Sequence, residues 1–318
     1  MSKMDKLNFK KRILFIGVPD MGYIGLDTLF FAGVNIVGVM GPLKTHNTYF
    51  NFRNFVKMRG LNFIEYDSLD NPDFINEIKE LNIDLAVVCS FNNKIPKVFI
   101  DSIKDGIVNV HPSLLPQYRG GNPYSWVIIN GENDTGVTLH FMSENFDEGD
   151  IIYQEKCSIS PNETMGTIFE KTNELGCKLL LKTIIEYEEK NSLPRRPQQK
   201  GNFIKANNLK NKELFINYNK SAEEIERFVR ALNPYISALT IFRNQIIKVH
   251  KVSICDCEIP ENTINGEIID ISNNKIYIKT NNSVISLDVL QNGGLFIGDT
   301  QDFINIIKPR IGEIFKNG

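Results

Sequence analysis

Two polar side chains suited to acyl-transfer chemistry stand two residues apart in the stretch NVHPSLLPQYRGG, residues 109–121. Side chains alternate between the two faces of a β-strand, so Asn109 and His111 are expected to point the same way. An amide N–H and an imidazole N–H directed at one point can hold an oxyanion, and an imidazole can also move a proton near neutral pH. The same stretch is equally compatible with a capped strand end followed by a tight turn.

A carboxylate that could complete this group is Asp147, in the stretch NFDEGD at 145–150. A crossover loop at this point could bring it against His111, where it would orient the ring and raise its basicity. The alternative is an ordinary acidic turn around Gly149. The residue pattern leaves both interpretations open.

The first 111 residues alternate apolar runs with amphipathic stretches. Continuous β-branched runs are typical of strands that are covered on both faces, and strand–helix alternation predicts a doubly wound, mostly parallel α/β sheet. Open sheets of this kind bind ligands at the carboxyl ends of their strands, which is where Asn109 and His111 lie. The predicted strands are 12–18, 34–40, 61–66, 85–90 and 106–111, and the predicted helices are 22–32, 51–59 and 73–81.

The rest of the chain predicts two more strands, a long helix and a smaller β-rich domain. The stretch at 191–202, NSLPRRPQQKGN, is polar and contains two prolines, as linkers do. Beyond it, Ser221 is the predicted N-cap of a helix, and four short β-rich runs predict a small open barrel or meander. The expected domains are a catalytic domain at 1–190, a linker at 191–202 and a β-rich domain at 203–318. The predicted elements are strands 136–142 and 150–159, helices 164–190 and 222–233, and strands 246–254, 266–271, 275–280 and 283–290.

The composition is that of a soluble globular protein: 318 residues, 42% hydrophobic, 23% charged, with a formal net charge of −2. This charge balance gives no electrostatic reason to expect a nucleic acid or an anionic membrane as partner. Five scattered cysteines suit a reducing compartment. The apolar run behind the basic N-terminus is too short for a signal sequence or a membrane span, so we expect a cytoplasmic protein.

Three separated blocks, NVHPSLLPQYRG, TGVTLHFM and DEGDII, resemble in this order the formyltransferase family that uses 10-formyltetrahydrofolate. That family includes methionyl-tRNA formyltransferases and amino-sugar nucleotide formyltransferases. The stretch GVPDMGYIGLDTLFFAG is similar to its first strand and helix, and SAEEIERFVRALNP to the start of its OB-like C-terminal domain. The resemblance covers nearly the whole chain and implies a Rossmann-like formyltransferase domain with a smaller OB-like domain.

The resemblance implies that Asn109, His111 and Asp147 are catalytic. Asn109 and His111 would donate N–H groups to the oxyanion, and Asp147 would hold His111 and help to remove a proton from the attacking amine. Direct transfer is expected, without a metal or a covalent enzyme intermediate. The pterin of the folate would lie against residues 90–96, although core packing explains Phe91 equally well. The candidate cofactor-binding residues are Phe91, Asn92, Ile95, Ser113, Leu114 and Leu115.

The acceptor amine is the least determined part of this interpretation. The tRNA enzymes of the family resemble one another in a basic, glycine-rich loop after the second strand, whereas this chain has GPLKTHNTYFNF, with one lysine. Residues 201–318 carry 14 Lys and Arg against 13 Asp and Glu, and the remainder is slightly acidic. The stretches PDMGYIGLDTL, PYSWVIINGE and TGVTLH are similar to the enzymes that formylate UDP-4-amino-4-deoxy-L-arabinose. We therefore expect an amino-sugar nucleotide, with methionyl-tRNA as the alternative.

The candidate substrate-binding residues are Asp20, Arg119, Tyr124 and Tyr153. For Arg119, a structural salt bridge is as compatible as a phosphate contact, and His140 fits a packed histidine better than a second catalyst. Two rival functions are hydrolysis of formyltetrahydrofolate and non-catalytic binding of folate or a sugar nucleotide. A homodimer is compatible with the sequence, which does not determine the oligomeric state.

Overall fold

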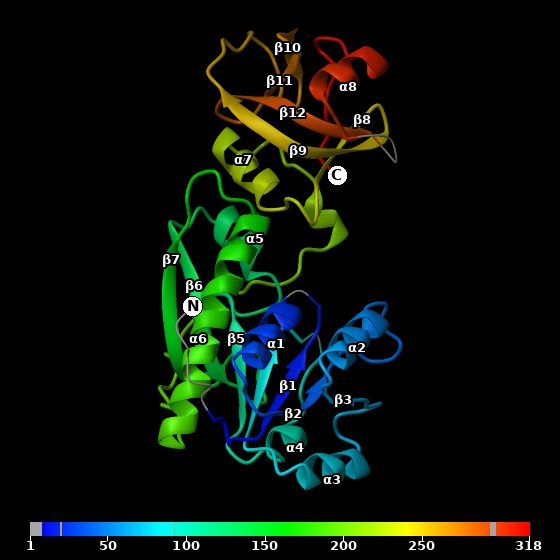
Figure 1. Cartoon of the computed structure of the whole chain (residues 1–318). Coiled ribbons are helices and arrows are strands. Elements are labelled where there is room, and N and C mark those ends of the chain that lie inside the picture. The colour runs from blue at the N-terminus through cyan, green and yellow to red at the C-terminus, as the bar shows by residue number, and fades with distance from the viewer. Residues whose placement is uncertain (1–7, 20, 92, 293–296) are drawn as a thin grey trace, which may run out of the picture. The chain divides into compact units, whose positions relative to one another are not determined.

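The computed structural model of the protein describes residues 8–19, 21–91, 93–292 and 297–318 (Figure 1). The chain forms two compact units that interleave along the sequence, whereas the sequence suggested consecutive domains. Unit 1 comprises residues 1–120, 135–158 and 170–206, and unit 2 comprises residues 121–134, 159–169 and 207–318. Residues 121–134 and 159–169 therefore pack with the C-terminal part of the chain.

Unit 1 is built on a seven-stranded sheet with the strand order β3-β2-β1-β4-β5-β6-β7. Strands β1 to β5 pair in parallel, and β6 is antiparallel to β5. The mostly parallel α/β sheet expected from the sequence is thus confirmed. Its strands are β1 (Ile13–Gly17), β2 (Ile36–Met40), β3 (Phe63–Ile64), β4 (Leu85–Cys89), β5 (Ile107–His111), β6 (Asp134–Phe141) and β7 (Ile151–Ser158).

Helices cover both faces of this sheet, which explains the continuous apolar strands. On one face Phe15 and Val110 join a core with residues of α1, α2 and α6. On the other face Leu14 and Ile107 join a second core, in which Phe74 of α3 stacks on Phe99 of α4 at 6.2 Å. The helices are α1 (Met21–Phe31), α2 (Tyr49–Met58), α3 (Pro72–Glu80), α4 (Lys97–Ile100) and α6 (Met165–Lys190), the last extending into unit 2.

Unit 2 contains an antiparallel sheet with the order β10-β11-β12-β9-β8, to which β13 adds by pairing with β12. The expected N-cap is present: the Ser221 side chain accepts a hydrogen bond from the Glu224 N–H in a reciprocal capping box at the start of α7. The elements are α5 (Pro123–Ile129), α7 (Ala222–Arg230), β8 (Ala238–Phe242), β9 (Gln245–Cys255), β10 (Ile268–Ser272), β11 (Lys275–Lys279), β12 (Val284–Asn292), β13 (Ile297–Asp299) and α8 (Thr300–Ile307), with a 3₁₀ turn at Asn211–Leu214.

The polar segment expected to be a linker follows the surface of unit 1 and bonds to it. Arg196 exchanges two backbone hydrogen bonds with Ile151, the first residue of β7, and the Tyr118 N–H donates to the Ile204 carbonyl at 2.7 Å. The Ala206 N–H donates to the Arg119 carbonyl, also at 2.7 Å. We call residues 194–206 the strap, since they connect the edge of the sheet to the loop that follows β5.

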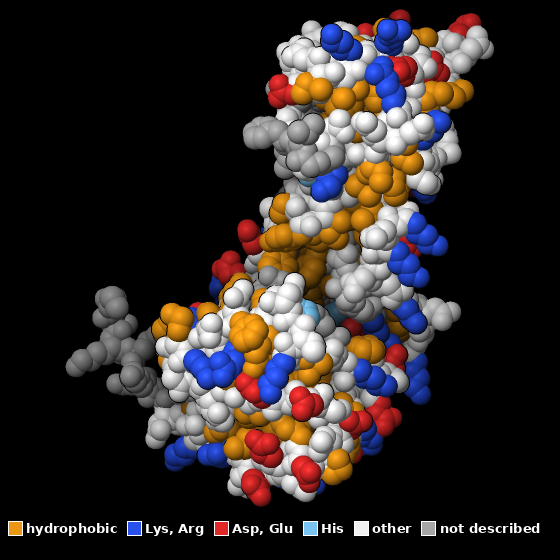
Figure 2. Space-filling view, turned by 90° about the vertical axis from the view of Figure 1, so that its right-hand side faces the viewer, with side chains coloured by type: hydrophobic (Ala, Val, Ile, Leu, Met, Phe, Trp, Pro, Cys, Tyr) orange, Lys and Arg blue, Asp and Glu red, His pale blue; other side chains and the backbone are white. Residues whose placement is uncertain are grey.

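On the face drawn in Figure 2, Lys and Arg side chains are interspersed with Asp and Glu. This mixture agrees with the near-neutral charge of the sequence. In the described parts of the chain, no helix has the length and apolar character that crossing a membrane requires.

Candidate active site

The turn after β6 brings the carboxylate of Asp147 between two histidines. Its Oδ2 lies 3.6 Å from His111 Nδ1, at the end of β5, and its Oδ1 lies 3.6 Å from His140 Nε2, on β6. Asn109 and His140 stand opposite each other in the β5–β6 pairing, and Asn109 Nδ2 contacts His140 Nε2 at 3.1 Å. Four polar side chains from three segments thus form one connected group, which we call the Asp147 cluster: Asn109, His111, His140 and Asp147.

Both ring nitrogens of His111 have defined surroundings. Its Nε2 lies 2.9 Å from the Tyr118 carbonyl, and because a carbonyl oxygen can only accept, Nε2 carries the hydrogen. In the neutral ring, Nδ1 is then the basic nitrogen, and it faces Asp147. Burial lowers the pKa of His111, and the negative charge of Asp147 only partly offsets this effect. His111 is therefore a neutral base with its lone pair beside a carboxylate.

His140 is the member of the cluster to which sequence reasoning gave no role. It is fully buried, as expected of a packed histidine, but its ring also contacts Asn109 and Asp147. Its Nδ1 donates to the Phe141 carbonyl at 2.9 Å, so in the neutral ring Nε2 accepts the Asn109 N–H. Within the part of the chain that the structure describes, the second N–H of Asn109 has no partner. The feature that connects His140 to the site is the pairing of β5 with β6, which places Asn109 opposite His140.

Asp147 is ionised and held in a strained backbone conformation. Burial alone would raise the pKa of Asp147, but the electrostatic interaction with the His111 ring, contacts with His140 and a 2.9 Å hydrogen bond from the Gly120 N–H bring that pKa well below its usual range. Its φ of +57° lies in the left-handed region, where a non-glycine residue costs energy. Gly120 itself has a φ of +124°, and a Cβ there would lie 2.7 Å from the Ala206 carbonyl oxygen.

Arg119, a candidate for binding a phosphate of the substrate, is engaged within unit 1. Its Nη1 donates to Glu148 Oε1 at 2.9 Å, while Nε and Nη2 donate to Gln198 Oε1 at 3.2 and 2.7 Å. These contacts match the structural alternative considered for this residue.

The candidate folate-binding residues lie in two segments of unit 1. Ile95 is buried in the core that contains α3 and α4, and Phe91 packs against it. Asn92 lies outside the described residues. Ser113 and Leu115 are buried and fix the loop after β5: the Ser113 hydroxyl donates to the Gln117 carbonyl, and the Leu115 N–H donates to Thr138 Oγ1. Leu114, between them, is half-buried.

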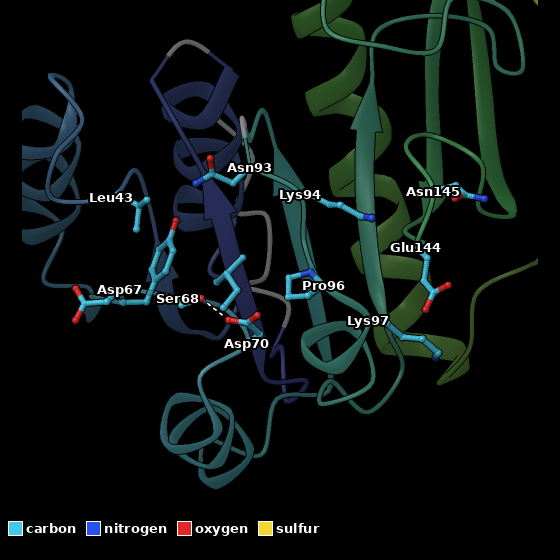
Figure 3. A pocket seen from close by; sticks show the side chains of 12 residues that line it. Leu43, Asp67, Ser68, Asp70, Asn93, Lys94, Pro96, Lys97, Glu144 and Asn145 are labelled. Carbon is cyan, nitrogen blue, oxygen red and sulfur yellow. Dashed lines mark hydrogen bonds between the residues drawn. The ribbon is translucent and has the colours of Figure 1, made fainter.

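A cavity of about 610 Å³ opens beside the first of these segments (Figure 3). It is lined by residues 66–70, by the loop before α4 and by Glu144 and Asn145, which precede Asp147 in the same turn. The cavity lining and the Asp147 cluster are therefore neighbours along the chain, since Asn145 belongs to the first and Asp147 to the second. Two lysines on it differ, since Lys97 pairs with Asp101 at 2.8 Å and Lys94 forms no ion pair with any described residue. The remaining lining residues are Leu43, Asn93 and Pro96.

Tyr153 and Tyr124, two other candidate substrate-binding residues, do not join the cluster. The Tyr153 hydroxyl donates to Glu186 at 2.5 Å, which raises the pKa of Tyr153 to about 12. Tyr124 is on α5, in unit 2, where its ring meets Phe169 edge-on at 5.2 Å. Asp20 lies outside the described residues.

The site combines a buried imidazole, an ionised carboxylate beside it and an amide donor, at the carboxyl end of a parallel strand. Such a group can catalyse transfer of an acyl group to an acceptor that must lose a proton. A family model described as formyl transferase matches residues 39–184, and a second, the formyl transferase C-terminal domain, matches residues 208–308. The chain belongs to the formyltransferase family. It is a one-carbon transferase whose formyl donor is a formylated tetrahydrofolate.

Among similar sequences, the methionyl-tRNA formyltransferase of Alkaliphilus oremlandii is 33% identical over 289 residues, which are 89% of this chain and 92% of the relative. The same enzyme of Clostridioides difficile is 34% identical over 294 residues, 88% of this chain and 92% of the relative.

Solved structures show the same fold in enzymes that act on sugars. The N-formyltransferase from Helicobacter canadensis, in complex with folinic acid and dTDP-3-aminofucose, has a TM-score of 0.65 at 19% identity and covers 89% of this chain and 100% of its own. The sugar 3N-formyl transferase WlaRD has a TM-score of 0.65 at 21% identity, covering 90% and 99%. At these identities the likeness concerns the fold alone.

Proposed function

We propose that this enzyme transfers the formyl group of 10-formyltetrahydrofolate to the primary amine of an amino-sugar nucleotide, with Asn109, His111 and Asp147 as its catalytic residues. The observation that carries the choice of acceptor is the neutralised segment after β2. Its single lysine, Lys44, pairs with Glu65 at 2.9 Å, and Arg53 pairs with the same carboxylate at 3.1 Å. Hydrogen bonds from Tyr49 and Lys44 lower the pKa of Glu65 to about 2, so this carboxylate stays charged.

In the proposed mechanism, the acceptor amine attacks the formyl carbon bound to N10 of the folate, and the carbonyl oxygen becomes an oxyanion. The unpartnered N–H of Asn109 supports a role as donor to this oxyanion. In neutral His111 the single ring N–H is bound to Tyr118, so His111 first acts as a base through Nδ1. It becomes a second donor only after it has taken up a proton.

The proton that the amine loses passes to His111 Nδ1, where the adjacent charge of Asp147 stabilises the imidazolium. Collapse of the tetrahedral intermediate breaks the bond between the formyl carbon and N10. The proton then returns to N10, which leaves as an amine, and the acceptor carries the new amide. Every group in this cycle is restored, as a catalyst requires.

The folate is proposed to bind against residues 90–96, with the cavity beside them receiving the part that extends from the pterin. Two features support this placement: the cavity is lined by Asn93 and Pro96 from that segment, and it adjoins the turn that carries Asp147. Lys94, on its lining, is suited to the carboxylates of the folate's glutamate portion.

The acceptor is proposed to be a small molecule because a tRNA enzyme would be expected to present many unpaired cations to phosphates. Here Lys44 and Arg53, in the segment after β2, are bound to Glu65, and positive and negative side chains are mixed on the surface drawn in Figure 2. Arg119, the other candidate cation, is bound to Glu148 and Gln198.

The second candidate acceptor is methionyl-tRNA. One observation favours it: relatives that are 33% and 34% identical over nearly the whole chain carry that activity in their names. The two candidates differ in size, charge and salt sensitivity, so one experiment separates them.

We would incubate the enzyme with 10-formyltetrahydrofolate and, in parallel, a panel of UDP- and dTDP-4-amino-sugars or 3-amino-sugars and charged initiator tRNA. Formylation of an amino-sugar nucleotide at the highest kcat/KM supports the proposal. Preferential formylation of the tRNA would replace it by the second candidate. Loss of the formyl group at the same rate without any acceptor would identify a hydrolase.

A further inference from the structure

The strap contains a glutamine that bonds directly to the turn carrying Asp147. The Gln198 Nε2 donates to the carbonyl oxygens of Asp147, at 2.7 Å, and Gly149, at 2.9 Å. Its Oε1 accepts two hydrogen bonds from Arg119, and the remaining Arg119 nitrogen donates to Glu148 of the same turn. Gln198 and Arg119 together therefore contact three consecutive residues of the turn, 147–149.

Polar contacts hold this turn: besides those of Gln198 and Arg119, the Gly120 N–H donates to Asp147 Oδ2 and Asn145 Nδ2 donates to Glu148 Oε2, both at 2.9 Å. Phe146, next to Asp147, is 62% exposed, so apolar packing does not anchor the chain there. The left-handed backbone of Asp147 needs surrounding contacts to persist. On the other side Gly149 lies so close to the Phe141 carbonyl oxygen that a Cβ would be 1.8 Å from it. Hydrogen bonds to the carbonyls at both ends of this short peptide are well placed to hold the conformation.

The chemistry of these contacts selects glutamine. Two carbonyl oxygens require N–H donors, and Arg119 requires an acceptor, so the side chain must offer both at one end. A glutamate of the same shape would keep the acceptor for Arg119 but present oxygen to the carbonyls. A methionine would fill similar space with neither donor nor acceptor.

We propose that Gln198 is a positioning residue for formyl transfer: held by Arg119, it fixes the Asp147 turn so that the carboxylate stays beside His111 and His140. Gln198 does not touch the reacting atoms and acts through Asp147. The inference rests on the role of Asp147 given in the proposed function.

The test compares Gln198→Glu and Gln198→Met with the same substitutions at Gln199, which is the adjacent glutamine, is exposed and takes part in no hydrogen bond within the described structure. We expect both Gln198 variants to lower kcat by about 10- to 100-fold, the loss that a small misplacement of a catalytic group produces. KM for 10-formyltetrahydrofolate should stay within about two-fold, and the Gln199 variants should match the wild type.

A second measurement needs no substrate. The sequence has four histidines, so NMR titration can follow His111 individually. The charged or titratable groups that face it are Asp147, His140 and Arg119, and displacement of the Asp147 carboxylate weakens the interaction that raises the pKa of His111. The pKa of His111 should therefore be lower in the Gln198→Met variant than in the Gln199→Met variant.

Unchanged kcat and an unchanged His111 titration in folded Gln198 variants would overturn the proposal. Loss of cooperative melting in both variants would do so as well, because it would assign Gln198 a general structural role. A shifted titration in a protein that formylates no amine would leave this inference standing and remove the proposed function instead.

Discussion

Two polar regions of unit 1 are built in opposite ways. In the Asp147 cluster, His111 and His140 are nearly inaccessible to solvent, and each charged or polar group contacts at least one other member or a backbone group. The cavity beside residues 93–97 is lined by more polar side chains than the cluster contains, but Asp67, Asp70 and Lys94 are exposed and do not contact one another. The side chains of the first region are fixed by burial and mutual contacts, whereas these three side chains of the second region face solvent.

The difference indicates that the reaction requires a fixed geometry in the first region but not in the second. Proton transfer requires defined distances in a buried setting, since electrostatic effects are large there. Binding of a flexible, charged ligand is achieved at a wet surface, where single contacts contribute little. The following predictions test this contrast, beginning with the largest expected effect.

Asp147→Asn should reduce kcat by about 10²- to 10⁴-fold, because the amide cannot stabilise a protonated His111. His111→Ala should lose a comparable amount. Single-turnover formyl transfer measures both, and a melting temperature near that of the wild type shows that the fold survives. Rates within a few-fold of the wild type in both variants would contradict the assigned roles.

His140→Phe should lower kcat by about ten-fold, less than the loss at Asp147. The phenyl ring fills the buried site but leaves the Asn109 N–H unpaired and removes one neighbour of the carboxylate. His140→Asn, which retains a polar side chain, should recover part of the activity. Equal kcat in His140→Phe and the wild type would show that the cluster consists of three residues only.

The acid limb of the kcat/KM profile should reflect a histidine pKa below about 6.5, since His111 must be neutral to accept a proton and burial lowers its pKa. The sign of the stability effect follows from the same shift. The unfolded chain takes up this proton at higher pH than the folded one, so the free energy of unfolding decreases as the pH falls through this range.

The control for this pH dependence is His46→Ala, because His46 is exposed and remote in sequence from the cluster. Because His46 Nδ1 contacts Thr48, the melting temperature itself can change in this variant, but its decrease between pH 8 and 5 should persist. An acid limb centred above pH 7 would contradict a lowered His111 pKa.

Lys94→Ala should raise KM for 10-formyltetrahydrofolate by about two- to five-fold and leave kcat unchanged, as expected for one exposed ionic contact. Lys97→Ala is the matched control, since Lys97 already pairs with Asp101. A large loss of kcat in the Lys94 variant would mean that the cavity takes part in the chemistry.

Tyr153→Phe is expected to have the smallest effect, below about two-fold on kcat and KM. Its hydroxyl is bound to Glu186 of α6 and not to the cluster. A strong rise of KM for the acceptor alone would restore Tyr153 as a substrate-binding residue.

Sequence patterns predicted most of the sheet, because its buried strands are apolar on both faces. They located β1, β2, β4 and β5 to within two residues at each end, but overestimated β3, in which only Phe63 and Ile64 pair. The helices α4 and α5 were missed because they have only 4 and 7 residues. Helices of this length are too short to show a periodic pattern of apolar residues.

Residue types and spacing made Asn109, His111 and Asp147 candidates, and the family resemblance gave them catalytic roles, but the residues that hold them in place were not predicted. Nothing local to Gln198 indicates that its amide bonds to residues 147 and 149, some fifty positions earlier. Likewise, Arg119 is identified as a bound cation only when Glu148 and Gln198 are placed beside it. Long-range hydrogen bonds leave no periodic trace in a sequence, whereas burial does.

The strap gives the synthesis of this protein a definite order. All seven strands of the large sheet precede Gln198 in the chain, so they are synthesised while the Asp147 turn still lacks the donors that Gln198 supplies. A nascent chain ending at residue 190 would contain every proposed catalytic side chain and yet be unfinished as a catalyst. If Gln198 positions the turn as proposed, full activity would arise only after residues 194–206 have been added and its amide has bonded to residues 147 and 149.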